Sequence, residues 1–173
     1  SPKLEKIWPM ARSIIVLAFK ELDSVESDNH QIAVNGRLDV IEFSRSVNYQ
    51  LARYLEKEFK AKAMTVPVSY PLDMGGTSMG TVADVSLRHA AVAAGLGVFG
   101  RHNLVIHPRF GTRVIFSAVL SDLDLPSDPP VQDELCDNCN LCVVECPAGA
   151  LDEAGKTDVV KCLACSQPYG LGA

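Results

Sequence analysis

The residues best suited to chemistry in this 173-residue chain are its six cysteines, all of which fall between positions 136 and 165. The first four, Cys136, Cys139, Cys142 and Cys146, follow the spacing C-x2-C-x2-C-x3-C, and Pro147 comes directly after them. This spacing is typical of proteins that hold a 4Fe-4S cluster. Three closely spaced thiolates can cap three corners of a cubane, and thiolate is a soft ligand that suits iron and sulfide. We therefore expect these cysteines to be cluster ligands.

A second pair, Cys162 and Cys165, begins another copy of the same spacing. The copy then fails, because its third and fourth positions are occupied by Pro168 and Gly172. Each cubane takes four thiolates, so six cysteines are too few for two complete sets. The pattern leaves three possibilities open: a single cluster, a second cluster with three irons or a non-cysteine ligand, or further ligands beyond Ala173.

A structural zinc site is the main alternative, since zinc sites also use C-x2-C pairs. Three cysteines at this spacing followed by x3-Cys-Pro are more typical of iron and sulfur. The first 135 residues contain no cysteine, whereas a secreted disulfide scaffold would spread its cysteines through the fold. We therefore expect a metal-binding module in a reducing compartment, with cytoplasmic localisation.

The charge and hydropathy of the chain bear on whether it binds nucleic acid or a membrane. The chain is 47% hydrophobic, with a net charge of −5 and a pI near 5.3. No basic face for nucleic acid is indicated, so we do not expect a nucleic-acid partner, although the composition leaves contact with tRNA through a local basic patch open. The longest apolar stretches, residues 13–19 and 114–120, are far shorter than the ~20 residues of a membrane-spanning helix. We expect a protein without a membrane partner that acts on a small molecule.

Hydrophobic periodicity predicts the elements that position the cysteines. The predicted strands are 12–19, 63–70, 103–107 and 113–120, and the predicted helices are 38–59 and 82–94. Residues 22–36 are polar and predict a loop. Pro67 indicates an edge or a bulge in the second strand, Gly95 ends the second helix, and Pro108–Gly111 predict a turn that joins the last two strands.

The segment 121–133 is rich in Asp and Pro and predicts a linker. We place the domain boundary there, with a cofactor domain at 1–128 and an iron–sulfur module at 129–173.

Gly95, Gly97 and Gly100 match the string G-x-G-x-x-G, but the predicted helix comes before it and a strand follows, which is the reverse of a dinucleotide site. A helix stop with a tight turn is the simpler interpretation. Glycines there would also permit close approach of a flat cofactor.

The same glycine segment carries a resemblance to a known family. Residues 90–106, AAVAAGLGVFGRHNLVI, resemble the "A..AGLGW.GKN.LLI" stretch of epoxyqueuosine reductases. Residues 115–126 resemble the family's "LGEI.TDL.LP", and residues 12–18 its early "ARSVIVLA". The cysteine run follows at the family's distance. Reductive dehalogenases share this architecture, and the resemblance extends over nearly the whole chain.

This resemblance implies an α+β protein in which a nitroreductase-like α/β domain is followed by a small ferredoxin-like 4Fe-4S module. It further implies a cobalamin cofactor that receives electrons from one or two clusters and reduces an epoxide or a carbon–halogen bond. An external donor such as a ferredoxin or flavodoxin would supply the electrons. The positions that match the family's cofactor turn are Gly97, Gly100, Arg101 and Asn103.

The chain departs from the family at two places, and no catalytic residue is assigned. The family's proton-donor Asp falls at Thr81, with Asp84 out of register, and Val98 replaces the family's Trp. Two alternatives follow: a non-catalytic electron-transfer subunit, or a flavin-binding relative. His102 is the best acid–base candidate among the histidines, and Tyr70 is a further candidate proton donor.

Overall fold

The computed structural model describes residues 7–68, 83–151 and 156–166, and it divides into two compact units. The first unit comprises Ser1–Leu96 and Arg113–Pro130, and the second comprises Gly97–Thr112 and Val131–Ala173. The chain thus enters the second unit twice. The predicted boundary at 128/129 lies two residues from the second crossing. Residues 97–112, expected in the first domain, group instead with the cysteine module.

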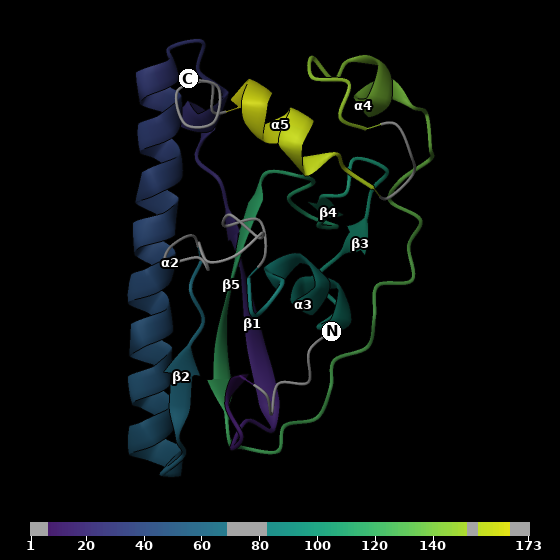
Figure 1. The fold of residues 1–173 in the computed structure, drawn as a ribbon. Coiled ribbons are helices and arrows are strands. Elements are labelled where there is room, and N and C mark those ends of the chain that lie inside the picture. Colours follow the sequence, from purple (N-terminus) through teal and green to yellow (C-terminus); the bar gives the residue numbers. More distant parts are fainter. Residues whose placement is uncertain (1–6, 69–82, 152–155, 167–173) are drawn as a thin grey trace. The chain divides into compact units, whose positions relative to one another are not determined.

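The first unit is built on a three-stranded antiparallel sheet in the order β1-β5-β2 (Figure 1). Its strands are β1 (Ser13–Lys20), β5 (Val114–Ser121) and β2 (Ala63–Thr65). The central strand β5 is buried from Ile115 to Ser121. A strand buried on both faces is apolar at nearly every position rather than at alternate ones, which is why this segment stands out in the sequence.

Two helices cover opposite faces of this sheet: α2 (His30–Phe59) and α3 (Leu87–Ala93). Val119 of β5 packs with Ala52 and Leu55 of α2, whereas its neighbours Ala118 and Leu120 lie in a second cluster that contacts Leu87 of α3. Successive side chains of a strand point to opposite faces. The sheet therefore lies between α2 and α3, as Figure 1 shows.

The predicted loop at 22–36 is wrong over most of its length. A short 3-10 helix, η1 (Asp23–Glu26), occupies its first part, and α2 begins at His30 rather than near residue 38. The Asn29 side chain caps α2 by accepting hydrogen bonds from the backbone N–H groups of Gln31 and Ile32, at 3.0 and 3.3 Å. The first turns of α2 are largely exposed, so they lack the apolar periodicity on which the prediction depended.

Other element boundaries differ in length. β2 ends at Thr65, so Pro67 follows the strand, and the predicted continuation to residue 70 lies partly outside the described residues. The second predicted helix is shorter than expected, because α3 begins at Leu87. Gly95 ends it as predicted, with a φ of 70° that favours glycine.

The second unit contains a hairpin of β3 (Val98–Phe99) and β4 (Val105–Ile106), together with two helices, α4 (Leu141–Val144) and α5 (Val159–Ser166). The predicted turn between 103–107 and 113–120 exists and is closed by a bridge between His107 and Gly111. The two strands that it joins do not pair with each other, because β4 pairs with β3 while β5 belongs to the other sheet. No helix among the described residues is long and apolar enough to cross a membrane.

Candidate iron–sulfur and cofactor site

The first two cysteines, Cys136 and Cys139, lie on a loop that reverses sharply around Cys139. Asn138 and Asn140 flank it with φ of 58° and 65°, a left-handed conformation that asparagine tolerates better than most residues. The side chain of Asp137 accepts a hydrogen bond from the backbone N–H of Cys139 at 3.1 Å. Cys142 follows in α4. The C-x2-C-x2-C spacing thus becomes a tight turn rather than a helix face.

Cys146 sits in a different environment, at the start of a loop whose backbone turns toward its sulfur. The N–H of Ala150 donates to the Cys146 Sγ over 3.4 Å. The backbone N–H groups of Ala150 and Ala148, with smaller contributions from Gly149 and Leu151, lower the pKa of this thiol. Gly149 has a φ of 55°, which lets the loop turn in this way. Backbone N–H groups directed at the Cys146 Sγ stabilise negative charge on the sulfur, which favours the thiolate form that binds iron.

The second cysteine pair lies on α5. Cys162 and Cys165 are three residues apart and therefore share one face of the helix. Both are exposed, and the backbone N–H of Cys162 donates to the Asp158 carbonyl at 3.0 Å in the first turn. This pair is presented on a regular helix, unlike the loop that carries Cys136 and Cys139.

All six cysteines are free thiols and none is fully buried. Cysteine is among the most frequently buried residues, so six accessible thiols in one module fit the ligands of a group that would cover them. Among the described residues, no three His, Cys, Asp or Glu side chains converge as the ligands of a single metal ion. Each thiolate of a cubane binds its own iron, so a cluster does not require convergence on one point.

The predicted cofactor glycines belong to the β3–β4 hairpin of the second unit. A Cβ on Gly97 would lie 2.7 Å from the Val105 Cγ1, and a Cβ on Gly100 would lie 2.6 Å from the His102 Cε1. Both distances are too short for a side chain. The close approach that these glycines permit is therefore already made by the hairpin itself, and their contact with a cofactor stays a prediction.

The turn of this hairpin is held by three hydrogen bonds. The N–H of Asn103 donates to the Gly100 carbonyl at 2.9 Å, and the N–H of Gly100 donates to the Leu104 carbonyl at 2.9 Å. Asn103 has a φ of 59°, and its Nδ2 donates to the Thr157 Oγ1 at 3.2 Å. The turn is thereby tied to the segment that leads into α5 and its cysteine pair. The hairpin that contains Gly97 and Gly100 thus belongs to the same compact unit as the cysteine module.

Two histidines of the hairpin are held by the backbone as neutral rings. His102 Nδ1 accepts from the N–H of Leu104 at 3.0 Å, and His107 Nδ1 accepts from the N–H of Arg109 at 3.1 Å. Burial lowers the pKa of both imidazoles, and Arg109 lowers that of His107 further. A neutral ring whose Nδ1 accepts carries its proton on Nε2, so His102 can offer one N–H donor.

The burial of Arg101 is a feature of the site that residue spacing could not reveal. Its side chain is half-buried, and its Nε is fully buried without a hydrogen-bond partner among the described residues. Of the other candidates, His89 Nδ1 lies 2.8 Å from the Ser86 Oγ, which gives it a local structural role. Tyr70 and Thr81 lie outside the described residues.

Comparison with known proteins agrees with this module. Residues 129–152 match the family described as "4Fe-4S binding domain", a range that includes Cys136 to Cys146. Cys162 and Cys165 lie outside the matched range, so their role as ligands stays a prediction.

Curated relatives extend the similarity to both units. An epoxyqueuosine reductase of Staphylococcus aureus is 30% identical over 162 residues, covering 94% of this chain and 41% of the relative. One of Bacillus anthracis is 34% identical over 92 residues, covering 53% of this chain and 24% of the relative. The chain thus spans less than half the length of these relatives.

Solved structures show the same fold. The crystal structure of an epoxyqueuosine reductase with an epoxyqueuosine-modified tRNA-Tyr stem loop matches with a TM-score of 0.62 at 20% identity, covering 92% of this chain and 41% of that one. The catabolic reductive dehalogenase NpRdhA matches with a TM-score of 0.68 at 19% identity, covering 87% and 22%. The chain is therefore similar in sequence to epoxyqueuosine reductases and similar in fold to both groups of reductases, with a 4Fe-4S binding domain at residues 129–152.

Proposed function

We propose that this chain forms the cofactor-binding and iron–sulfur part of a reductase that passes electrons from a 4Fe-4S cluster to a bound cobalamin. The observation that carries the proposal is the grouping of the glycine hairpin and the cysteine module into one compact unit, bonded through Asn103 and Thr157. An electron must pass between the two cofactors, so their binding segments have to be close. The sequence similarity to reductases over 162 residues supports the same conclusion.

The cysteines would hold the cluster in unequal ways. Cys136, Cys139 and Cys142 lie on the sharply turned loop and α4, where they can bind three irons of one cubane. Cys146 has its thiolate charge stabilised by backbone N–H groups, and hydrogen bonds to sulfur are one means by which proteins set a cluster's potential. We assign Cys146, Cys162 and Cys165 to a second ligand set, and each of the two sets of three is completed by a ligand outside these six cysteines.

The hairpin would hold the organic cofactor. When bound, cobalamin supplies a strongly reducing cobalt centre that can break a carbon–oxygen or carbon–halogen bond. Arg101 fits such a group because its buried Nε lacks an acceptor and cobalamin carries an anionic phosphodiester. Gly97, Gly100 and Asn103 would act by shaping the turn that presents Arg101. We further assign the first unit, with its antiparallel sheet between two helices, to a nitroreductase-like domain.

The substrate proposal differs from the expectation drawn from composition. A structural neighbour was solved with an epoxyqueuosine-modified tRNA stem loop. We propose that the substrate is likewise an epoxide on a tRNA nucleoside, which replaces the expected absence of a nucleic-acid partner. A net charge of −5 does not oppose this, because contact with RNA needs only a local basic patch. Reduction of an epoxide to an alkene takes two electrons and two protons and releases water. An external ferredoxin or flavodoxin would supply the electrons one at a time.

The test begins with protein purified without oxygen and analysed for iron, acid-labile sulfide, cobalt and zinc per chain. We expect about four irons with matching sulfide for one complete cubane, and stoichiometric cobalt after cobalamin is offered. In C142A we expect loss of the iron and sulfide of the first ligand set, whereas C162A retains them. Zinc without sulfide would overturn the cluster. Iron without cobalt binding would instead favour an electron-transfer subunit, or a flavin protein if a flavin spectrum is present.

A further inference from the structure

The hairpin turn presents hydrogen-bond donors without acceptors. Arg101 and His102 occupy the two central positions of the turn closed by Asn103 and Gly100. Among the described residues, none accepts from the backbone N–H of Arg101 or His102, from the Arg101 guanidinium, or from the Nε2 of His102. A turn followed by a left-handed residue, here Asn103, is an arrangement in which successive N–H groups can converge on an anion.

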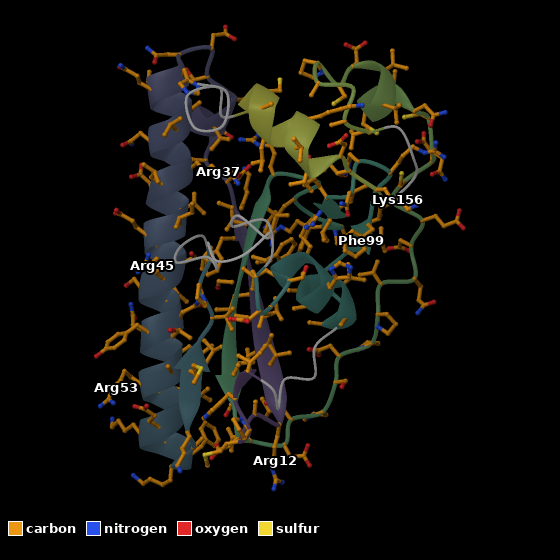
Figure 2. The ribbon with its side chains drawn as sticks, viewed as in Figure 1. Arg12, Arg37, Arg45, Arg53, Phe99 and Lys156 are labelled. Carbon is orange, nitrogen blue, oxygen red and sulfur yellow. The ribbon has the colours of Figure 1, made fainter. Side chains whose placement is uncertain are left out.

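Among the described residues, Arg101 and Arg113 have a buried Nε without a hydrogen-bond partner, but the Arg113 Nε lies 3.2 Å from a Glu26 carboxylate oxygen. Arg37 lies 3.6 Å from a Glu21 carboxylate oxygen, Arg53 pairs with Glu56, and Arg113 lies 2.8 Å from Asp23 (Arg37 and Arg53 are labelled in Figure 2). Arg37 and Arg53 are also well exposed, so water can solvate them. Arg101 is half-buried and has a fully buried Nε. A buried donor without an acceptor is costly, so such a group calls for a ligand.

The hydrogen-bond donors of Arg101, His102 and the turn indicate which class of ligand would bind. A guanidinium offers a planar fork of N–H donors that matches the oxygens of phosphate, and backbone N–H groups add donors at fixed positions. A neutral imidazole adds one N–H without adding charge. One cation with several neutral donors suits a singly charged phosphodiester better than a dianion.

We propose that Arg101, with the backbone N–H groups of the turn and the Nε2–H of His102, forms a recognition site for a phosphodiester oxyanion. The proposed function is needed only to say which natural molecule carries the phosphodiester. That phosphodiester lies in the nucleotide arm of cobalamin or in the backbone of the RNA substrate. The site itself stands on the geometry of the hairpin.

The experiment compares the wild-type protein, R101Q, R101K and R109Q, each purified without oxygen with its cluster in place. R109Q is the matched control, because Arg109 lies in the same unit, in the turn that follows β4, but is exposed, and its removal changes the net charge equally. The ligands titrated by calorimetry are cobalamin, cobinamide, which lacks the phosphodiester, and an epoxyqueuosine-type tRNA stem loop. Iron and sulfide per chain confirm that each variant is folded.

If the site holds the cobalamin phosphodiester, wild type and R109Q bind cobalamin more tightly than cobinamide. R101Q should lose this preference: its affinity for cobalamin should fall roughly tenfold or more, the expected effect of losing a charged hydrogen bond, while its affinity for cobinamide stays unchanged. R101K should recover part of it, since it keeps the charge but not the fork. If the loss appears instead with the stem loop, the site holds an RNA phosphate.

A further titration separates the site from the proposed function. If wild type binds neither cobalamin nor the stem loop, the proposed function fails. Inorganic phosphate titrated by 31P NMR still tests the site, with binding expected in wild type and R109Q and lost in R101Q. Equal affinities of R101Q and R109Q for all of these ligands would overturn the proposal.

Discussion

The Nδ2 of Asn103 donates a hydrogen bond to the Oγ1 of Thr157 at 3.2 Å, joining the glycine hairpin to the segment that leads into α5. The two residues are 54 positions apart, so the bond joins the two pieces of the second unit, Gly97–Thr112 and Val131–Ala173. T157V removes the acceptor while keeping the shape of the side chain. We expect it to lower stability by about 1 kcal/mol and to speed the loss of iron to a chelator.

T157S is the matched control for this substitution, because it keeps the hydroxyl group. Its rate of iron loss, followed by the visible absorbance of the cluster, should stay near that of wild type. Equal rates of iron loss in T157V and wild type would show that the bond does not hold the module together.

The loop around Cys146 predicts an acidic thiol in the metal-free protein. Backbone N–H groups hold the pKa of Cys146 below its usual value, so its thiolate persists to lower pH and its alkylation by iodoacetamide should remain fast there. G149A should slow this alkylation, because Gly149 has a φ of 55° and an alanine there strains the loop that carries the N–H groups. Peptide mass spectrometry after timed alkylation at several pH values measures the effect.

G111A is the control for backbone strain at that loop. Gly111 has a φ of 61°, and a Cβ at either glycine would meet no atom within 4 Å. Both variants therefore introduce strain without a steric clash. If G111A changed the alkylation of Cys146 as much as G149A does, the effect would belong to general destabilisation rather than to the loop.

The two hairpin histidines predict a pH dependence of a definite sign. Burial lowers the pKa of His102 and His107, so the unfolded chain binds their protons more readily than the folded one. Their contribution to stability is full above the ordinary imidazole pKa of about 6.5 and falls as the pH drops below it. NMR titration of the imidazoles should give midpoints below about 6.5 for both rings.

R109Q distinguishes the causes of these two shifts. Arg109 lowers the pKa of His107 but is not among the causes for His102. The variant should therefore raise the titration midpoint of His107 and leave that of His102 in place. An equal rise at both rings would indicate that the hairpin had opened.

A buried polar pair predicts the response of the first unit to substitution. Ser117 of β5 donates to the Asn48 Oδ1 at 2.6 Å, and Asn48 of α2 donates to the Ala118 carbonyl at 3.4 Å. Both side chains are at most 1% exposed. N48A leaves the Ser117 hydroxyl unpaired and should lower the free energy of unfolding by roughly 1–3 kcal/mol. Urea denaturation gives this value.

The double variant N48A/S117A tests whether the two side chains act as a pair. It removes both polar groups together, so its cost should be smaller than the sum of the single costs. Additive costs would show that Asn48 stabilises the unit only through its other contacts.

The local elements were predictable where apolar periodicity was strong. β1 and β5 are nearly continuous apolar runs, and the later part of α2 shows helical spacing up to its end at Phe59. The first turns of α2 were missed because they are exposed, and a polar surface helix is recognisable only through its Asn29 cap. The partner of β4 was missed because strand pairing is a long-range choice that a strong turn at 108–111 does not determine.

The sequence by itself determined the chemistry of this protein, because the spacing of Cys136 to Cys146 restricts those thiolates to one neighbourhood whatever the rest of the chain does. Only the tertiary structure decided which segment shares that neighbourhood. It grouped the segment Gly97–Thr112 with the cysteines and tied Asn103 to Thr157, and no described residue accepts a hydrogen bond from the buried Nε of Arg101. Whether a side chain is buried and finds a hydrogen-bond partner depends on contacts between residues distant in sequence, which the local spacing of residues does not predict.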